Sequence, residues 1–447
     1  MADTRDTLKL EERVSRLVEA AVKAGADAAD AVVVRSGSTS VSVRLGKVEN
    51  TESSSNDDVS LRVFVGSRSA SVSATTGYDP SRLAERAVAM AKASPEDRLN
   101  TLADPGRLAT EFPDLDLFDP FEPDASAMTE TALAMEAAAL DVAGVTNSGG
   151  AGVSAGYGGL VLATSHGFIG SYVASRFSRS VSVLAGEGTA MERDYDFSSA
   201  LHHGDLRDAA EIGRQAGERA IARVGASRMK TGPVEVIFDP RVARGLAGSL
   251  AGAINGASVA RKTSFLREMM GKQVAHGSIS VTDDPLRRRG ASSRPFDGEG
   301  VQGKPLTMIE AGVLHHWTLS TSAARELGME TNGRGVRSAS AVNPSSTNFA
   351  IGAGVSDPAD MIASVSHGIY VTELIGQGVN MVTGDYSRGA SGFRIENGRL
   401  AGPVSGVTLA GNLKDMFLSM QPANDLDLSF GTASPTLFIG RMTLAGD

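Results

Sequence analysis

The chain contains no cysteine among its 447 residues. This absence excludes disulfide bonds, thiolate zinc sites, iron–sulfur clusters and cysteine nucleophiles. Long hydrophobic runs are also missing: no stretch reaches about 18 apolar residues, so the sequence predicts no membrane span. The first 25 residues are charged and lack the apolar core of a signal peptide, so we expect a cytoplasmic location.

An excess of basic residues is likewise absent. Lys and Arg together number 43 against 52 Asp and Glu, which gives a net charge of −9. Proteins that bind duplex nucleic acid usually carry a basic excess, because they displace counterions from the phosphates. The sequence therefore predicts no direct nucleic-acid partner.

What is present is the balance of a soluble globular protein, with 41% hydrophobic and 21% charged residues. A chain of this length is long for one hydrophobic core, and two or three domains are expected. Changes of pattern predict an N-terminal α+β domain over 1–110, a central α+β domain over 111–226 and a β-rich C-terminal domain over 227–447.

In the first region, apolar residues at helical spacing from Leu10 to Ala21 predict a helix that ends near Gly25. Asp79 and Pro80 are a typical N-cap and first-turn pair for a second helix over 81–93. Between them, alternating apolar and polar residues predict short strands over 32–34, 41–45, 59–65 and 70–74. This order of elements indicates an α+β unit.

A Pro- and Asp-rich stretch over 94–124 predicts a linker, followed by helices over 126–142 and 205–224 that flank strands over 152–184. Beyond residue 234, short apolar runs separated by glycine predict many strands, and Asn397-Gly398 predicts a two-residue hairpin turn. The predicted fold class is α+β, with an N-terminal α/β region of helices and antiparallel strands. A large, mostly antiparallel β domain follows at the C-terminus.

The segment 152–156, "GVSAG", matches the G-x-S-x-G pattern of a nucleophile elbow, with Ser154 as the nucleophile. The elbow requires a strand before the serine and a helix after it. The residues that follow, "GYGGLVLATS", predict a turn and another strand. A stand-alone serine-type hydrolase is therefore an alternative hypothesis and not the favoured one.

Histidines are the strong nitrogen ligands available to a metal in this chain. None belongs to an H-E-x-x-H motif, and none has an acidic residue placed to orient it at helical spacing. We therefore interpret them as surface or hydrogen-bonded residues. They are His166, His202, His203, His276, His315, His316 and His367.

Two further stretches stand out by composition. The run 283–290, "DDPLRRRG", predicts a solvated loop, with docking of an acidic partner or a peptide carboxylate as the alternative. The stretch 241–265 is rich in alanine and glycine, follows the strand-like run 234–238, and contains no His, Cys, Asp or Glu. It predicts a helix with almost no reactive side chain.

Three blocks of the sequence resemble the TldD/PmbA family, in its PmbA (TldE) branch. The longest, 368–417, begins "GIYVTELIGQGVNMVTGDYSRG" and is similar to the C-terminal signature of that family; 312–333 and 165–198 also fit. The resemblance covers nearly the whole chain. It implies an N-terminal α/β part and a β-rich C-terminal domain, in agreement with the patterns described above.

The TldD-type subunits of this family carry an H-E-x-x-x-H helix that binds the catalytic metal, with a cysteine ligand near the C-terminus. The resemblance places the three degenerate motif positions of this chain at Ala247, Gly248 and Gly252, and no nearby register supplies a ligand. We therefore expect no cofactor and no metal in this chain, and zinc on a TldD-type partner. The stretch is either the relic of a metal helix or a closely packed Ala/Gly-rich helix.

The resemblance implies a non-catalytic PmbA/TldE-like subunit that forms a cytoplasmic heterodimeric metalloprotease with a TldD-type subunit and acts on unfolded peptides. A homodimer of the isolated chain is compatible with this expectation. The alternatives are the serine-type hydrolase and a non-enzymatic modulator of DNA gyrase, against which the acidic charge argues.

The glycine-punctuated run 376–392 is expected near the peptide-binding chamber of such a complex. Gly378 and Gly384 would let backbones approach closely. Asp385 and Arg388 would contact the peptide or the partner, or alternatively form an ion pair with each other.

Overall fold

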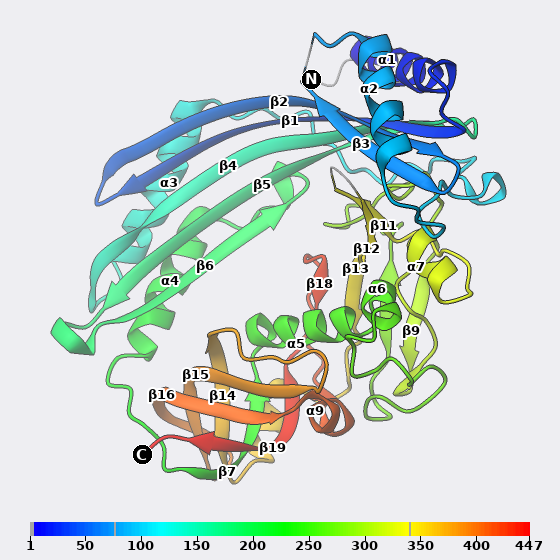
Figure 1. Cartoon of the computed structure of the whole chain (residues 1–447). Coiled ribbons are helices and arrows are strands. Elements are labelled where there is room, and N and C mark those ends of the chain that lie inside the picture. The colour runs from blue at the N-terminus through cyan, green and yellow to red at the C-terminus, as the bar shows by residue number, and fades with distance from the viewer. Residues whose placement is uncertain (1–3, 76, 339–340) are drawn as a thin grey trace.

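The structure is a computed structural model that describes residues 4–75, 77–338 and 341–447 (Figure 1). Its N-terminal half is built on one antiparallel sheet of six strands in the order β3-β2-β1-β4-β5-β6, which we call the long sheet. Several of its strands have 17–20 residues, against a usual 3–10. The strands are β1 Ala28–Arg44, β2 Lys47–Val65, β3 Arg68–Ala74, β4 Val145–Thr164, β5 Ile169–Ala185 and β6 Glu192–Ala200.

Helices cover one face of the long sheet at both of its ends. They are α1 Thr4–Lys23, α2 Pro80–Ala93, α3 Ala125–Leu140 and α4 Ala209–Ala222. α1 and α2 pack on Ala31 and Val33 of β1, and α3 and α4 pack on Val41 and Val43 of the same strand. These contacts are all odd-numbered, and successive side chains of a strand alternate faces, so all four helices lie on the same face.

The C-terminal half contains a closed ring of strands in the order β16-β15-β14-β7-β19, in which β16 also pairs with β19. Within the ring, β7 and β14 run parallel and the other pairs run antiparallel. The strands are β7 Gly232–Phe238, β14 His367–Ile375, β15 Asp385–Glu396, β16 Arg399–Asn412 and β19 Leu437–Ala445, with β17 Gln421–Pro422 added beside β19.

A smaller sheet, β10-β9-β8-β13-β18, and the ribbon β11-β12 complete the strands of this half. Their bounds are β8 Val281–Asp284, β9 Leu306–Glu310, β10 Val313–Leu314, β11 Gly335–Arg337, β12 Val342–Pro344, β13 Asn348–Ile351 and β18 Thr432–Ala433. The helices are α5 Pro240–Ala253, α6 Gly256–Ala260, α7 Thr321–Glu326, α8 Pro358–Ala363 and α9 Leu413–Ser419. The predicted α+β class and the mostly antiparallel C-terminal half are confirmed.

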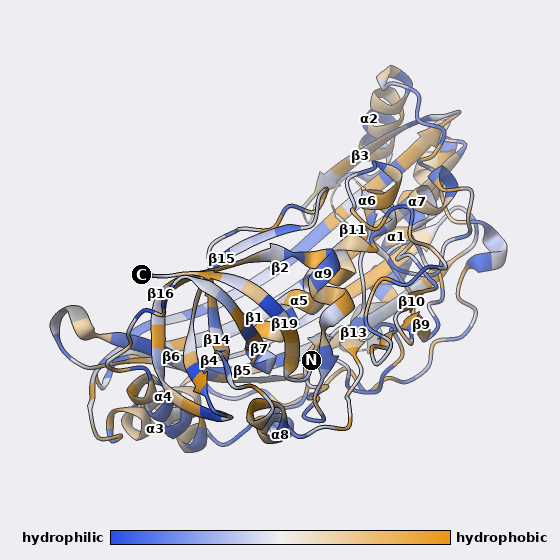
Figure 2. Ribbon diagram, turned by 90° about the horizontal axis from the view of Figure 1, so that it is seen from below, coloured by the Kyte–Doolittle hydropathy of each residue, from blue (hydrophilic) through white to orange (hydrophobic). Residues whose placement is uncertain are grey.

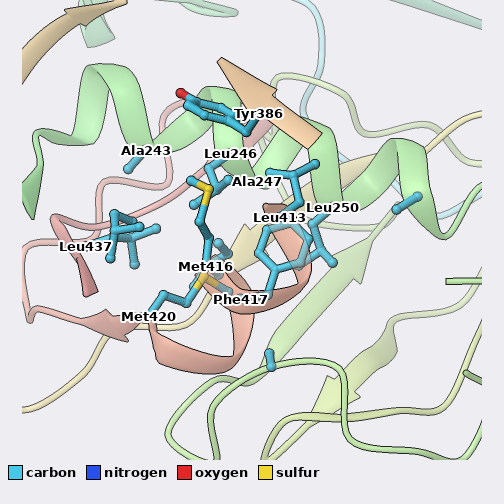
Figure 3. Close-up of a cluster of buried hydrophobic side chains, with 14 of the residues drawn as sticks. Ala243, Leu246, Ala247, Leu250, Tyr386, Leu413, Met416, Phe417, Met420 and Leu437 are labelled. Carbon is cyan, nitrogen blue, oxygen red and sulfur yellow. The ribbon is translucent and has the colours of Figure 1, made fainter. Parts of the chain in front are cut away.

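The largest hydrophobic core of the chain lies between α5, α9 and the strand ring. Figure 3 shows side chains of α5 and α9 packed against one another, with Leu437 of β19 and Tyr386 of β15 beside them. The α5 and α9 residues labelled there are Ala243, Leu246, Ala247, Leu250, Leu413, Met416 and Phe417. α5 is therefore fixed along its buried face over much of its length.

Local sequence signals predicted two boundaries correctly. The carboxylate of Asp79 accepts hydrogen bonds from the backbone N–H groups of Ser81 and Arg82 at 2.9 and 3.3 Å, as an N-cap of α2 does. Asn397 and Gly398 have φ angles of 50° and 76° between β15 and β16, as the predicted hairpin turn requires.

The predicted strands of the first region are too short. Those over 32–34 and 41–45 are parts of the single strand β1, and the polar stretch 47–58 is the mostly exposed first part of β2. This stretch pairs with β1 from Lys47↔Arg44 to Asp58↔Val34. Backbone pairing extends the sheet here without apolar burial, and burial is the signal on which the prediction relied.

The first two predicted regions share the long sheet. β1 pairs with β4 from Asp30↔Thr164 to Val43↔Ala151, so strands from 1–110 and from 111–226 form one layer. The stretch 94–124 between them is mostly irregular but buries several leucines against the sheet. The boundary near residue 110 stays a prediction.

Figure 2 colours the ribbon by hydropathy and shows hydrophilic and hydrophobic residues following one another along strands of the long sheet. Among the described helices, none combines the length and the apolar character needed to cross a membrane.

Candidate functional site

The helix α5 lies between the strand ring and the long sheet and carries the predicted motif positions. Asp239 caps it: one carboxylate oxygen accepts from the backbone N–H of Arg241 at 2.9 Å, and the other accepts from the hydroxyl of Tyr370 at 2.9 Å. Burial, and then the negative charge of Asp239 beside the hydroxyl, raise the pKa of Tyr370. The helix start is thus tied to β14.

The three motif positions have different surroundings. Ala247 is fully buried against α9 (Figure 3), Gly248 is exposed, and Gly252 is partly buried near Met381. None of these residues has a side-chain donor for a metal. Within residues 4–75, 77–338 and 341–447, no group of three or more His, Cys, Asp or Glu side chains is placed to hold one. The residues present do not fit a metal site.

Close packing accounts for the alanines of α5 but not for its exposed glycines. Ala243, Ala247 and Ala253 are fully buried. At Gly245 and Gly248, by contrast, an added Cβ would meet no atom within 4 Å. The buried alanines fit a closely packed helix, packing within the described residues does not account for Gly245 and Gly248, and both interpretations of this stretch stay open.

The face of the long sheet without helices, which we call the inner face, is lined mainly by serine and glycine in the middle of its strands, with Arg176, Tyr195 and Phe197 beside them. Its residues are half-buried or exposed. The even-numbered positions of β1, β4 and β5 and the odd-numbered positions of β6 lie together on it through the strand register. They are Ser36, Ser38, Ser40, Ser42, Gly152, Ser154, Gly156, Gly158, Arg176, Ser178, Ser180, Ser182, Tyr195, Phe197 and Ser199.

Arginines of α5 reach across to the inner face. The guanidinium of Arg241 lies 5.8 Å from the ring centre of Tyr195, and it donates to the carboxylate of Asp194 at 2.9 Å. The guanidinium of Arg244 lies 3.6 Å from the ring centre of Phe430 and 5.9 Å from that of Phe197. α5 therefore faces the inner face, as Figure 1 also shows.

A cavity of about 700 Å³ lies where α5 and the inner face meet. Its wall is formed by residues 196–201 at the edge strand β6, by the start of α5 with Arg241 and Arg244, and by the segment 425–434 with Phe430. β6 ends the long sheet, so its outer edge has no strand partner in the described part of the chain. The cavity thus combines an open strand edge, aromatic rings and charged side chains.

The predicted contact residues Gly378, Gly384, Asp385 and Arg388 lie after the C-terminal end of β14, in the loop to β15 and at the start of β15. In the loop after this strand, the backbone of Gly378 packs directly on β15: its carbonyl accepts from the N–H of Ser387 at 2.7 Å. An added Cβ at Gly378 would clash with the Ser387 carbonyl oxygen. Gly384 has a φ of 88° in the same loop, a conformation that favours glycine. Both glycines are therefore required by the loop geometry, whatever their functional role.

Asp385 and Arg388 do not bond to each other in the described structure. Asp385 accepts from the hydroxyl of Thr383 at 2.6 Å and from the amide of Asn412 at 3.1 Å. Arg388 donates to the carbonyl of Leu374 at 3.4 Å and borders a second cavity of about 340 Å³, next to Tyr195 of β6 and the exposed face of α5. Of these two residues, Arg388 is the one beside the inner face.

The G-x-S-x-G segment lies in the middle of strand β4 and not at a strand-to-helix turn. Ser154 lies opposite Ser178 of β5, and their hydroxyl oxygens are 2.8 Å apart. A nucleophile elbow needs a sharp turn into a helix that exposes the serine. The geometry therefore gives no support to the serine-hydrolase alternative.

The histidines are scattered, and the clearest cases have structural partners. A ring nitrogen of His166 lies 2.9 Å from the Ala103 carbonyl, and one of His202 lies 2.9 Å from the Asp116 carbonyl. His203 stacks on Phe121, and burial, together with the charge of Arg179, lowers its pKa.

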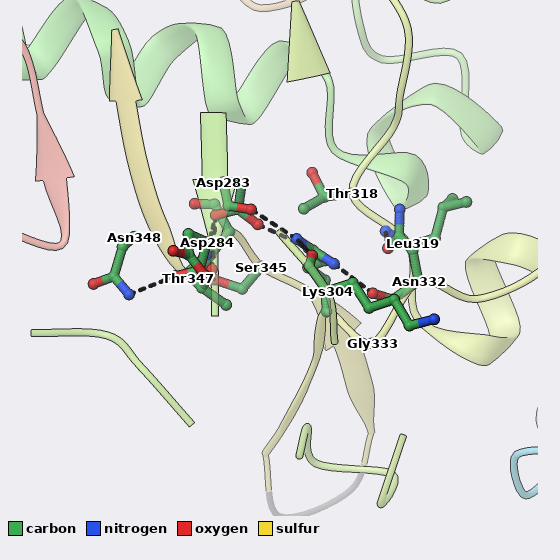
Figure 4. Close-up of polar contacts among 12 residues, drawn as sticks. Asp283, Asp284, Lys304, Thr318, Leu319, Asn332, Gly333, Ser345, Thr347 and Asn348 are labelled. Carbon is green, nitrogen blue, oxygen red and sulfur yellow. Dashed lines mark hydrogen bonds and ion pairs between the residues drawn. The ribbon is translucent and has the colours of Figure 1, made fainter. Parts of the chain in front are cut away.

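Several residues of the run 283–290 form hydrogen bonds and ion pairs within the chain. Asp283 is fully buried and accepts from Arg334 at 2.8 Å and from the backbone N–H of Thr347 at 2.6 Å, a network shown in Figure 4. Arg288 and Arg289 donate to Asp116 at 2.9 and 2.6 Å. Arg289 also lines the 700 Å³ cavity.

A buried ion-pair cluster joins the long sheet to the C-terminal half. Asp30 of β1 accepts two hydrogen bonds of 2.7 Å from Arg337 of β11 and one of 2.6 Å from Arg62 of β2. Burial alone would raise the pKa of Asp30, but the two arginines lower it to about 2. This cluster fixes one end of the inner face above the C-terminal half.

Two further carboxylates lie beside this cluster. A Cβ at Gly335 would lie 2.9 Å from an oxygen of Asp297 and 3.0 Å from one of Glu299, so the two carboxylates flank one small space. Glu299 accepts from the backbone N–H of Thr321 at 2.8 Å. Burial, and then the charge of Asp297, raise the pKa of Glu299 to about 7.

Sequence reasoning missed Arg244, Tyr195, Phe197 and Phe430. No local signal identifies them, because they come from three separate segments that meet only in the folded chain. The serines of the inner face did leave a signal, since every second residue from Ser36 to Ser42 is serine.

Three family models of PmbA/TldA metallopeptidases match this chain. The model of domain 1 matches residues 29–91, that of the central domain matches 118–224, and that of the C-terminal domain matches 231–446. Together they account for most of the chain.

Curated relatives match over the full length. The chain is 36% identical to Metalloprotease PmbA of Escherichia coli O157:H7, over 98% of this chain and 96% of the relative. It is 35% identical to a Metalloprotease PmbA homolog of Haemophilus influenzae with the same coverage. A Metalloprotease TldD homolog of Haemophilus influenzae is 26% identical over 66% of this chain and 67% of that protein.

Solved structures share the fold. One from Bacteroides thetaiotaomicron, described as a proposed modulator of DNA gyrase, has a TM-score of 0.89 at 27% identity and covers 98% of both chains. TldE from Thermococcus kodakarensis has a TM-score of 0.85 at 21% identity, over 97% of this chain and 99% of that one. With the three matching domain models and the full-length identity to PmbA, these findings show that the chain belongs to the PmbA/TldD metallopeptidase family, in its PmbA (TldE) branch.

Proposed function

We propose that this chain is the non-catalytic subunit of a cytoplasmic TldD/TldE-type metalloprotease that degrades unfolded peptides. It pairs with a TldD-type subunit, which supplies the zinc. The observation that carries the proposal is the combination of full-length identity to PmbA with an α5 that offers no metal donor at Ala247, Gly248 or Gly252. A peptidase subunit without ligands needs a partner that has them.

The inner face is the surface that we assign to the substrate. Hydroxyl groups would make hydrogen bonds without selecting particular side chains, and glycines would leave room for the peptide, which suits a site that accepts many sequences. The free edge of β6 would pair with the backbone of an extended peptide, a mode that is independent of side-chain identity. Folded proteins would be excluded, because their strands are already paired.

The predicted contact segment 376–392 has a place in this proposal through Arg388. This residue borders the smaller cavity beside α5 and β6, where it would contact the peptide or the partner subunit. We assign Gly378 and Gly384 the supporting role of shaping the loop that precedes it.

The test is reconstitution with a TldD-type subunit that carries the H-E-x-x-x-H motif. Cleavage of a fluorogenic unstructured peptide is measured with this chain alone, with the partner alone and with both. We expect no cleavage by this chain alone, the fastest cleavage by the pair, and loss of activity when a chelator is added. Chelator-resistant cleavage by this chain alone would instead support a stand-alone hydrolase and overturn the proposal.

A further inference from the structure

Arg244 differs from the other arginines that line the 700 Å³ cavity, because it has no ion-pair partner. The other four each have a carboxylate partner: Arg207 and Arg219 bond to Asp196 at 2.8 and 2.7 Å, Arg241 to Asp194 at 2.9 Å, and Arg289 to Asp205 at 3.0 Å. In the described part of the chain, no carboxylate lies within 4.0 Å of the Arg244 guanidinium, and no protein group accepts a hydrogen bond from it.

Aromatic rings hold the guanidinium of Arg244 in the cavity without occupying its donors. Its guanidinium stacks on Phe430 at 3.6 Å from the ring centre, with Phe197 on a second side at 5.9 Å. Burial lowers the pKa of Arg244, although an arginine remains charged at neutral pH. Stacking holds the planar group in place and leaves its N–H donors free. The guanidinium is half-buried, and its nitrogens are not among the buried atoms that lack a partner in the described residues, so a ligand in the cavity can reach its donors.

The nearest acidic groups do not neutralise Arg244. Asp427 and Asp239 act on it only from beyond ion-pair distance. The carboxylate of Asp427 accepts from the backbone N–H and the hydroxyl of Ser429, both at 2.8 Å. That of Asp239 accepts from the N–H of Arg241 and the hydroxyl of Tyr370. Both carboxylates are therefore engaged elsewhere, and the donors of Arg244 stay available to a ligand.

We propose that Arg244 is the anchor of a carboxylate-binding subsite in this cavity, and that its ligand is the carboxylate of a peptide. A guanidinium presents two parallel N–H donors that match the two oxygens of a carboxylate. The open edge of β6 lies in the same cavity wall, so a peptide held there has its carboxylate beside the guanidinium. The chain terminus and an acidic side chain offer the same group. This inference rests on the proposed function only in taking the ligand to be a peptide.

The experiment measures binding to the isolated full-length chain by fluorescence anisotropy. Three alanine-rich hexapeptides with an N-terminal fluorophore are compared: a free acid, the same sequence as a carboxamide, and a carboxamide with one internal glutamate. We expect the free acid to bind about tenfold or more tightly than the plain carboxamide. Recovery of binding by the glutamate peptide identifies an acidic side chain as a second ligand, and no recovery restricts the subsite to chain termini.

Variants assign the effect to Arg244. Arg244→Gln should remove the preference for the free acid, whereas Arg214→Gln, the same charge change on the exposed face of α4, should keep it. Asp427→Asn retains an oxygen for Ser429 but removes the competing charge, so we expect about threefold tighter binding of the free acid. The Asp427→Asn variant keeps the test decisive if Arg244→Gln does not fold.

Equal affinity for the free acid and the plain carboxamide overturns the inference, as does an unchanged preference in Arg244→Gln or the absence of any measurable binding. Because the assay needs neither a partner nor cleavage, its failure is distinguishable from failure of the proposed function. If the reconstituted pair cleaves peptides but the isolated chain shows no carboxylate preference, only the carboxylate-subsite inference is wrong. If the isolated chain prefers the free acid but the reconstituted pair does not cleave peptides, only the proposed protease function is wrong.

Discussion

Buried charged side chains differ in whether they have a counter-charge. Arg334 and Asp283 are fully buried and satisfy each other, together with surrounding backbone groups. Removing one partner of such a pair costs about 3–5 kcal/mol, because the other is left buried and unpaired. Asp297 and Glu299 are different: in the described residues neither has an ion-pair partner within 4.0 Å, and burial raises the pKa of both. Glu299 is therefore a source of pH-dependent stability.

We predict that Glu299→Gln removes much of this pH dependence. The pKa of Glu299 is about 7 in the folded chain against an ordinary 4.5, so between these values the folded state binds more protons than the unfolded state. The free energy of unfolding of the wild type therefore falls as pH rises through this window. Glutamine cannot ionise but can still accept from Thr321. At about pH 8 the variant should be more stable by on the order of 1–3 kcal/mol.

Denaturant unfolding at about pH 5 and about pH 8 measures this effect. Glu310→Gln, a change at an exposed carboxylate, is the control and should keep the slope of the wild type. A Glu299→Gln variant with the wild-type slope would show that Glu299 ionises normally in the folded chain.

Arg388→Ala tests the predicted contact residue. Its hydrogen bond to the Leu374 carbonyl is long, at 3.4 Å, so we expect the melting temperature and the pairing with a TldD-type subunit to change little. Peptide cleavage by the reconstituted complex should fall, because the guanidinium borders the cavity beside α5 and β6. Normal cleavage or loss of folding in this variant would exclude the segment 376–392 from the substrate site. Arg399→Ala, at the exposed start of β16, is the matched control.

At the scale of single elements, the sequence predicts those features that depend on local chemistry. The Asp79 cap and the Asn397-Gly398 turn are examples, since each depends on the conformation of a few neighbouring residues. The polar part of β2 is the counter-example. Its strand conformation comes from pairing with β1, and no periodic burial marks it in the sequence.

Two helical glycines should respond to alanine in opposite directions. At Gly248 of α5 an added Cβ meets nothing within 4 Å, so Gly248→Ala should stabilise the chain by about 0.5–1 kcal/mol through reduced freedom of the unfolded state. At Gly213 of α4 the Cβ would lie 2.3 Å from the Met135 carbonyl oxygen of α3, so Gly213→Ala should destabilise by about 1–3 kcal/mol. Urea unfolding compares the two. Destabilisation by Gly248→Ala would mean that its exposed face is packed in solution.

At the scale of the whole molecule, the sequence is informative about family and less so about how distant segments meet. The resemblance placed the degenerate positions on one helix, and the structure describes such a helix at Pro240–Ala253. The cavity beside it brings together β6, α5 and the segment with Phe430. Such a meeting depends on tertiary packing, which no single stretch of sequence encodes.

We predict that the chain associates through its β-rich half, as a homodimer when alone and as a heterodimer with a TldD-type subunit. Homologous subunits pair naturally about a two-fold axis. This half exposes large apolar side chains that an interface would bury, among them Ile375, Leu418 and the 95% exposed Val355. Light scattering at micromolar concentrations measures the mass, and a monomer both alone and with the partner would refute the prediction.

The metal content of the purified chain tests the central claim most directly. α5 has no metal donor at its motif positions, the chain has no cysteine, and its described histidines do not gather into a site. After exposure to zinc and gel filtration, elemental analysis should find no stoichiometric zinc in this chain alone, and about one zinc per heterodimer when the TldD-type subunit is present. About one tightly held zinc per isolated chain, lost on substitution of any of its histidines, would contradict the account.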